Sequence, residues 1–278
     1  MSDAFFYITR GEGPLIISAP HAGVELPVEV AEQLTPAAHL SADTDWHLRE
    51  LYAPLAARLN ATLLTARLSR YAIDLNRPES DESLYPGQRT TGLCPRESFE
   101  GVPLYLHGGE VSAEEKARRV ERYWRPYHAA LTAALAAAVE RHGWALLWEA
   151  HSIRSEVPML FEGRLPDFNL GTHSGRACAP EIRARLESIL SAHPALQPTR
   201  PDPYSWVMDG RFKGGYITRH YGRPLEGVHA VQLELSQRAY LSDERAPLGG
   251  VRPAWSEEAA AEAREVIGAL LEGALGAV

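Results

Sequence analysis

The chain has 278 residues, with 28 Lys and Arg against 36 Asp and Glu, which gives a formal net charge of −8. Hydrophobic residues make up 45% of it and charged residues 23%, a composition that is typical of a globular protein and excludes a disordered or fibrous one. The negative charge argues against a nucleic-acid partner, because non-specific binding of nucleic acid needs a basic surface to displace counterions. A few arginines can still make a single cleft positive.

The cysteine content and the lengths of the apolar runs indicate the cellular compartment in which the protein is expected. Cys94 and Cys178 lie far apart and in no Cys-x-x-Cys pattern, so neither a disulfide framework nor a cysteine-rich zinc site is expected. The first ten residues lack the basic and apolar segments of a signal peptide. The longest near-apolar run, Ala129 to Val139, is too short to cross a bilayer. These features predict a cytoplasmic protein that has no membrane partner.

Apolar runs of strand length alternate along the chain with segments of helical periodicity. The predicted strands are Leu15 to Ser18, Ala61 to Thr65, Tyr71 to Leu75, Trp144 to Trp148, Met159 to Phe161 and Val228 to Leu235. The predicted helices are Asp45 to Leu59 with Asp43 or Thr44 as its cap, Ala113 to Arg141 with a break near Pro126, Ala179 to Ala192, and Ser256 to Leu275. This order predicts a layered α/β fold with a largely buried sheet, formed as one domain over residues 1–278.

Two segments have no predicted helix or strand. Residues 79–103 are rich in Gly, Pro, Ser and charged residues, and residues 199–215 are similar. Long loops in a compact domain often act as lids or binding loops. A disordered surface excursion explains the same composition, and the sequence does not decide between the two.

Histidines follow two of the predicted strands. Ser18-Ala19-Pro20-His21 places His21 just beyond the first strand, and Trp148-Glu149-Ala150-His151 places His151 just beyond the fourth. If these strands are parallel neighbours, both histidines lie at the edge of the sheet where open α/β folds bind their ligands. A turn histidine without a function would explain either one alone.

Asp43-Thr44-Asp45-Trp46-His47 precedes a predicted helix. Acidic residues and Thr are common there because they cap and complement the helix N-terminus. A carboxylate fixed at this point could instead complete a metal site with two histidines, leaving one coordination position open, as catalytic zinc sites do. Both interpretations remain open at this stage.

Two more motifs carry charge on predicted strands. Arg77 follows Asp74-Leu75-Asn76, and its planar guanidinium suits bidentate recognition of a carboxylate, although pairing with Asp74 is the simpler explanation. Glu234 lies in Val231-Gln232-Leu233-Glu234-Leu235-Ser236, on the polar side of an alternating strand. A general base that faces a metal-bound water would account for a buried glutamate there, and an exposed strand face would account for it equally simply.

Taken in order, these motifs resemble those of the N-formylglutamate amidohydrolase family, which is related more distantly to aspartoacylases and zinc carboxypeptidases. The strings that carry the resemblance span nearly the whole chain: PLIISAPHAGVELP, DTDWHLRELY, SRYAIDLNRP, EAHSIRSEVP, GRFKGGYITRHYG and GVHAVQLELSQRAYL. The resemblance implies a three-layer αβα sandwich with a mixed, mostly parallel central sheet. It also implies one Zn²⁺ per chain and hydrolysis of N-formyl-L-glutamate to L-glutamate and formate, a step of histidine degradation.

The resemblance also assigns roles to residues. His21 and His151 are the implied zinc ligands, but the His-x-x-Glu pair of the related enzymes is absent, since the first glutamate after His21 comes one position late. We therefore expect Asp45 to be the carboxylate ligand, with Glu25 and Asp43 as alternatives. The implied roles of the remaining residues are general base and acid for Glu234, and substrate binding for Asn76, Arg77, Arg211 and Arg219.

Two other functions fit the same motifs. One is an amidohydrolase that acts on a different N-acyl amino acid or on a γ-glutamyl peptide. The other is a non-catalytic anion-binding protein that has kept the fold and lost the metal. The partner expected for the enzyme is a small anionic N-acyl amino acid, and the sequence does not predict an oligomeric state.

Overall fold

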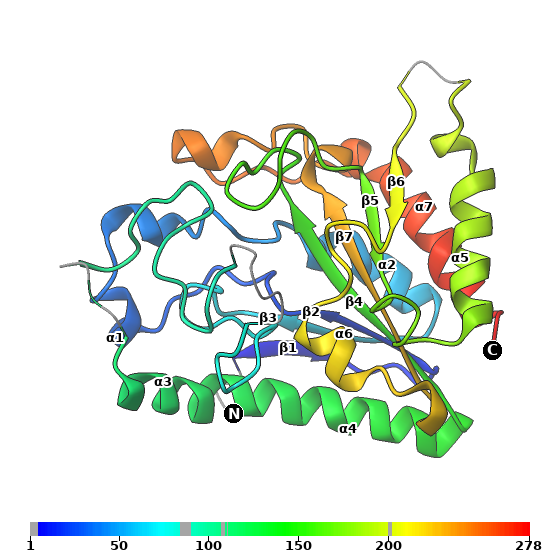
Figure 1. Ribbon diagram of the computed structural model, residues 1–278, viewed down its shortest axis with the longest axis horizontal. Helices are drawn as coiled ribbons and strands as arrows, with labels where there is room; N and C mark the ends of the chain where they lie inside the picture. The colour runs from blue at the N-terminus through cyan, green and yellow to red at the C-terminus, as the bar shows by residue number, and fades with distance from the viewer. Residues whose placement is uncertain (1–4, 84–89, 107–108, 110, 200–201) are drawn as a thin grey trace.

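Seven strands form one mixed sheet in the order β1-β3-β2-β4-β7-β5-β6 in the computed structural model (Figure 1). Their bounds are β1 Phe6–Thr9, β2 Leu15–Ala19, β3 Thr62–Ala66, β4 Ala145–Ile153, β5 Phe168–Gly171, β6 Trp206–Met208 and β7 Val228–Ser236. Four of the six neighbouring pairs are parallel, and the pairs β1–β3 and β5–β7 are antiparallel. The structure describes residues 5–83, 90–106, 109, 111–199 and 202–278.

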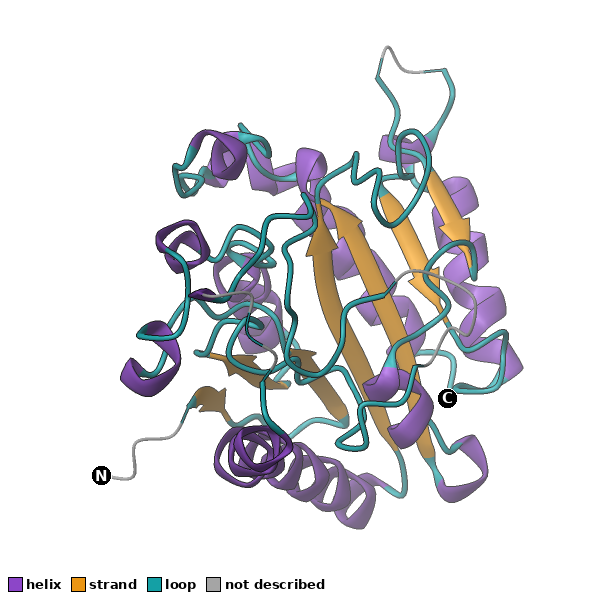
Figure 2. Cartoon of the chain, turned by 60° about the vertical axis from the view of Figure 1, so that its left-hand side comes forward, coloured by secondary structure: helices purple, strands orange, loops and turns teal. Residues whose placement is uncertain are grey.

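Helices cover both faces of this sheet (Figure 2). On one face α2, α5 and α7 pack against the apolar side chains of β2, β4 and β7. On the other face lie α4, α6 and described residues of the stretches 68–75 and 93–105, together with Val111. The predicted αβα sandwich with a mixed, mostly parallel sheet is therefore confirmed. The helix bounds are α1 Val28–Ala31, α2 Leu48–Arg58, α3 Ala113–Arg119, α4 Arg125–His142, α5 Pro180–Ala192, α6 Tyr216–Tyr221 and α7 Glu257–Leu275.

The alternation of side chains along β4 and β7 locates the functional half of the sheet. Trp148 and Ala150 of β4, like Leu233 of β7, point into the apolar core beneath α2, α5 and α7. The opposite face begins apolar, with Leu147, and becomes polar toward the carboxyl end of the strand, with Glu149 and then His151. Since a strand turns every second side chain to the same face, one polar surface forms across the two neighbouring strands.

Two predicted strands were wrong. Tyr71 to Leu75 and Met159 to Phe161 are apolar but lie in turns. In the first segment Ala72 N–H donates to Ser69 O, and in the second Phe161 N–H donates to Val157 O, so these backbone groups are satisfied locally rather than by a sheet. His151 is also not beyond its strand as predicted, because β4 continues to Ile153.

Three short strands, β1, β5 and β6, were not predicted. β1 and β6 form the edges of the sheet, and β5 joins β6 to β7. β6 lies inside the segment 199–215, which therefore is not a loop throughout. Strands of three or four residues are too short to give a periodic signal, and tertiary pairing decides their conformation.

Most helix predictions were accurate, and the start of α2 was not. This helix begins at Leu48, three residues later than predicted, after His47 in a left-handed conformation with φ of 56°. No side chain caps α2, so the predicted capping roles of Asp43 and Thr44 were wrong. The break predicted near Pro126 is a single π-helical stretch, Val120–Trp124, which joins α3 to α4 just before that proline.

Among the helices of the described residues, none combines the length and the apolar character that a membrane span requires.

The core of the sheet makes a stability test possible. Leu233 of β7 is fully buried, whereas Leu225 is fully exposed. Leu233→Ala should lower the free energy of unfolding by about 2–5 kcal/mol, because it removes buried methyl groups and leaves a cavity. Leu225→Ala should leave it nearly unchanged. Denaturant unfolding of both variants measures the difference, and equal midpoints would contradict the packing described here.

Candidate metal and active site

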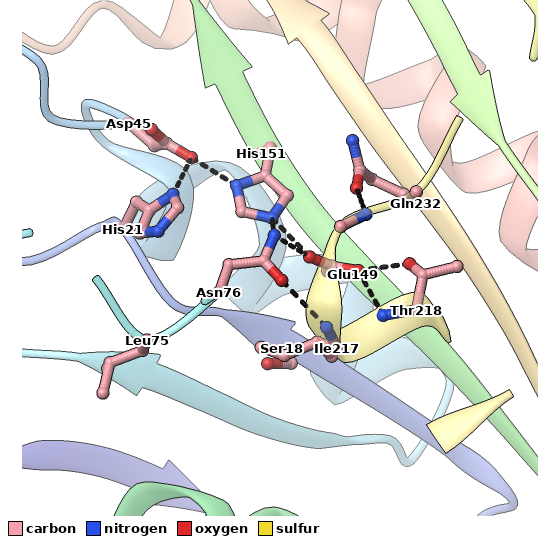
Figure 3. Close-up of polar contacts among 12 residues, drawn as sticks. Ser18, His21, Asp45, Leu75, Asn76, Glu149, His151, Ile217, Thr218 and Gln232 are labelled. Atoms are coloured by element: carbon pink, nitrogen blue, oxygen red, sulfur yellow. Dashed lines mark hydrogen bonds and ion pairs between the residues drawn. The ribbon is translucent and has the colours of Figure 1, made fainter. Parts of the chain in front are cut away.

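The site lies where β2, β4 and β7 end side by side at the carboxyl edge of the sheet (Figure 3). β2 runs parallel to β4, as the prediction that His21 and His151 meet requires. The register of β4 and β7 places His151 beside Glu234 and Glu149 beside Gln232. All four of these side chains are buried. Ionisable groups are therefore close together and shielded from water, so they must be stabilised by pairing with one another or with a ligand.

His21, Asp45 and His151 form a buried cluster whose potential ligand atoms all lie within 4.8 Å of one another. Asp45 Oδ2 is 2.9 Å from His151 Nδ1 and 3.9 Å from His21 Nδ1. Ligands at zinc distances of about 2.0–2.1 Å in a tetrahedron stand about 3.3 Å apart. The sequence thus named the three residues that the fold brings together.

Asp45 is held in place by the backbone. Its N–H donates to the carbonyl of His21 at 3.0 Å, and its Oδ2 accepts from the N–H of Ser152 at 3.1 Å. The two alternative carboxylates lie elsewhere. Glu25 is half-exposed and pairs with Arg67, and Asp43 accepts from the N–H of Phe99. Of these three carboxylates, Asp45 is therefore the one that the structure places against both histidines.

The second ring nitrogen of His21 faces a buried carboxylate. His21 Nε2 lies 2.6 Å from Asp74 Oδ1, and Arg70 Nη2 donates to Asp74 Oδ2 at 2.8 Å. Burial alone would raise the pKa of Asp74, but the charges of His21 and Arg70 hold it well below its usual value. Burial, with Arg70 nearby, lowers the pKa of His21. An ionised Asp74 can only accept, so His21 Nε2 carries the proton and Nδ1 presents its lone pair toward Asp45.

His151 is arranged in the same way. Its Nε2 lies 2.7 Å from Glu149 Oε1, and its Nδ1 faces Asp45. Burial alone would lower the pKa of His151, but hydrogen bonds to Asp45 and Glu149 and the charges of these carboxylates raise it well above 6.5. Both histidines therefore have a carboxylate behind Nε2 and turn Nδ1 toward a shared point.

This donor set fits a zinc ion. Histidines that ligate metals usually donate their other ring N–H to a carboxylate or a carbonyl, which fixes the tautomer and orients the ring. Here both imidazoles have such a partner, and the carboxylate of Asp45 is the third donor. Three protein ligands of the His₂-carboxylate type leave one position open, as in catalytic zinc sites.

Glu234 lines the same cavity as the three potential ligands. Its carboxylate makes no hydrogen bond within the described part of the chain, and burial raises its pKa to about 8. A cation at His21, Asp45 and His151 would lower that pKa, because an opposite charge favours the ionised form. A carboxylate that gains and loses a proton near neutral pH is suited to general acid–base chemistry.

The predicted substrate arginines have different positions. Arg77 and Arg211 line the cavity, together with Arg70, which had not been singled out. Arg77 Nε is 3.9 Å from Asp74 Oδ2, so the pairing proposed as the simpler explanation is also present. Arg219 is not among the described residues that line the cavity, because its Nε turns back to donate to the carbonyl of Gly214.

Asn76 also lines the cavity, but its amide is engaged by the protein. Nδ2 donates to Glu149, and Oδ1 accepts from the N–H of Ile217 at 2.9 Å. These contacts direct the side chain toward β4 and α6, so they favour a positioning role over the predicted grip on a substrate.

Both long segments without predicted structure reach the cavity. Thr90, Thr91 and Phe99 come from residues 79–103, and Phe212 and Gly215 come from residues 199–215. Residues 84–89 and 200–201 of these segments lie outside the described residues, and the predicted lid remains a prediction.

Sequence reasoning missed the carboxylates that support the histidines. Glu149 lies two positions before His151, so strand alternation alone puts both side chains on the same face. Asp74 carried a weaker signal, because its partner His21 is 53 positions away in the chain.

Comparisons with known proteins show what the chain is similar to. The model of the N-formylglutamate amidohydrolase family matches residues 13–241. An N-formylglutamate deformylase of Pseudomonas aeruginosa is 48% identical over 273 residues, which cover 98% of this chain and 97% of that protein. One of Pseudomonas putida is 48% identical over 234 residues and covers 84% of each chain.

Solved structures show the same similarity. The crystal structure of an N-formylglutamate amidohydrolase from Ralstonia eutropha JMP134 superposes with a TM-score of 0.78 at 26% identity, covering 99% of this chain and 98% of that one. The gene product Atu2144 of Agrobacterium tumefaciens shares the fold, with a TM-score of 0.68 at 15% identity, over 97% of this chain and 95% of that one.

Zinc binding should release protons. The raised pKa of His151 favours the protonated ring, and a metal that takes Nδ1 must displace that proton. A cation would also lower the pKa of Glu234 and release its proton, so about one to two protons per ion should leave. The apparent zinc affinity should rise as the pH increases toward the pKa of His151. Titration calorimetry of metal-free protein in two buffers of different ionisation enthalpy measures this release, and buffer-independent heats would contradict it.

Proposed function

The chain belongs to the N-formylglutamate amidohydrolase family, and from this premise we propose that it hydrolyses N-formyl-L-glutamate to L-glutamate and formate with one Zn²⁺ per chain. The single observation that carries the proposal is the buried His21–Asp45–His151 cluster beside Glu234 in an arginine-lined cavity. The reaction would serve histidine degradation in the cytoplasm.

In this proposal His21 and His151 would hold zinc through Nδ1, and Asp45 would hold it through its carboxylate. Zinc in such a set supplies a Lewis acid that polarises the formyl group and makes water acidic enough to react near neutral pH. The chain supplies the rigid placement of these ligands, since Asp74 and Glu149 fix the two rings and Ser152 fixes Asp45.

Glu234 moves the protons. Its carboxylate accepts a proton from the attacking water and returns it to the amine nitrogen of glutamate as the C–N bond breaks. Its place on β7, directly beside His151 on β4, puts it next to the proposed metal position. General acid–base catalysis by a positioned carboxylate contributes about 10²–10⁴-fold to a rate.

Arginines recognise the substrate. Arg77 and Arg211 lie far apart in the chain, and both line the cavity. Their positive charges suit the two carboxylates of the glutamate moiety. Arg70 is buried in the same wall, and its Nε has no hydrogen-bond partner among the described residues. Because Arg70 lines the cavity, its positive charge would stabilise the negative charge that develops on the formyl oxygen.

Metal analysis and formate release test the proposal together. Protein purified without chelator should contain about one zinc per chain and release formate from N-formyl-L-glutamate. Chelation should abolish formate release, and added zinc should restore it. Absence of both metal and formate would contradict the proposal and favour a non-catalytic anion-binding protein.

The same assay with N-acetyl-L-glutamate and N-succinyl-L-glutamate tests the acyl group. Phe99, Ile153, Leu160 and Phe212 narrow the cavity, so the larger acyl groups should react more slowly. Faster release of acetate or succinate than of formate would instead support an amidohydrolase for another N-acyl amino acid.

Glu234→Gln tests the base. The amide cannot accept the proton from water, so kcat should fall by about 10²–10⁴-fold while the zinc content stays at the parent level. Glu226→Gln is the matched control, because Glu226 is exposed and pairs only with Arg223 among the described residues. Near-normal turnover of the Glu234 variant with zinc bound would show that another group takes the proton.

A further inference from the structure

Glu149 lies behind the proposed metal site rather than in it. It is fully buried and does not appear among the residues that line the cavity. Its carboxylate nevertheless faces His151 Nε2 at 2.7 Å, on the side of the ring away from Asp45 (Figure 3). A buried carboxylate is stable only when hydrogen-bond donors or opposite charges surround it. The groups that contact Glu149 therefore indicate its role.

Donors surround Glu149. Oε2 accepts from the backbone N–H of Thr218 at 2.8 Å and from the Thr218 hydroxyl, and Oε1 accepts from Asn76 Nδ2. A carboxylate with these three donors acts as an acceptor at each oxygen, and His151 Nε2 is also within reach of Oε1. Asn76 Nδ2 lies 3.0 Å from His151 Nε2 as well, and both nitrogens converge on Oε1, which accepts from each of them. His151 therefore donates its Nε2–H to Glu149.

Backbone groups of α6 determine that Asn76 Nδ2 and the Thr218 N–H act as donors to Glu149. Asn76 Oδ1 accepts from the N–H of Ile217, so the Asn76 amide cannot flip and must point Nδ2 at Glu149. The Thr218 donor that fixes Oε2 is a backbone N–H. One residue before α6, the N–H of Gly215 donates to Gln232 Oε1 at 2.7 Å.

Gly215 allows this close approach. A Cβ atom at Gly215 would lie 2.3 Å from Asn76 Nδ2, so only glycine lets the chain enter α6 against Asn76. Gly215 and the first turn of α6 thus donate to three side chains, Gln232 of β7, Asn76 and Glu149 of β4, where an isolated helix would leave its first N–H groups unpaired.

We propose that Glu149 is a positioning residue that, oriented by Asn76 and the first turn of α6, holds the proton of His151 on Nε2 and thereby presents Nδ1 to the metal. The inference rests on the proposed function, because it assigns a role toward the zinc site. According to this inference, Glu149 affects the affinity for zinc although it does not line the cavity.

Glu149→Gln tests this role with almost no change in shape. The Thr218 backbone N–H requires the amide oxygen of the new side chain, so the amide nitrogen must face His151 Nε2. Two donors would then meet, unless His151 moves its proton to Nδ1, which is the nitrogen that the metal needs. Zinc affinity should fall by about 10–100-fold, as measured by competition with a chromophoric chelator.

Two controls separate positioning from support of the fold. Glu244→Gln changes another partly buried carboxylate, which holds Ser155, and should leave the zinc affinity unchanged. Thr218→Val removes one donor to Glu149 but keeps the backbone N–H and the carboxylate, so it should weaken zinc binding less than Glu149→Gln does. Nitrogen-15 NMR of the zinc-loaded parent should show His151 protonated at Nε2, with a strongly downfield proton that the Glu149→Gln variant loses.

The outcomes distinguish this inference from the proposed function. If the parent binds zinc and releases formate but Glu149→Gln binds zinc equally well, Glu149 has no positioning role and only this inference fails. Equal weakening by Thr218→Val, with the His151 Nε2–H signal retained in Glu149→Gln, would show support of α6 instead and would also overturn it. A parent without zinc or formate release overturns the proposed function itself.

Discussion

The arrangement of the site depends on one constraint: each of its two histidines has a buried carboxylate behind one ring nitrogen. Asp74 faces Nε2 of His21, and Glu149 faces Nε2 of His151. A buried carboxylate is costly unless donors satisfy it, so the pairing stabilises the acid and orients the ring at the same time. Both Nδ1 atoms then face Asp45, so the packing of the charges brings together three groups that could hold a metal ion.

The sheet makes this pairing possible. Parallel β2, β4 and β7 end together, so His21 and His151 meet although the chain separates them by 130 positions. Strand alternation then places Glu149 and His151 on one face, with Glu234 beside them on the neighbouring strand. The opposite face of the same strands is mostly apolar beneath α2, α5 and α7, and this packing gives the polar face a rigid base.

The layered α/β fold could be predicted from the sequence, because apolar periodicity is a local signal. The meeting of His21 and His151 could be predicted from their places near two strand ends, whereas Asp45 was expected from the family resemblance, with Glu25 and Asp43 as alternatives. The turns at Tyr71 to Leu75 and Met159 to Phe161 could not be predicted, since an apolar run is compatible with any buried conformation. The position of Arg219 and the partners of Asn76 depend on where α6 packs. That packing is a tertiary contact, for which a single sequence carries no period or cap signal.

Anomalous diffraction at the zinc absorption edge, from crystals of the zinc-loaded protein, tests the central claim most directly. The account predicts one anomalous peak, bound by Nδ1 of His21, Nδ1 of His151 and the Asp45 carboxylate, with Asp74 and Glu149 still against the two Nε2 atoms. Ligation of either histidine through Nε2, or a peak away from these three residues, would contradict the claim that the buried carboxylates set the metal site.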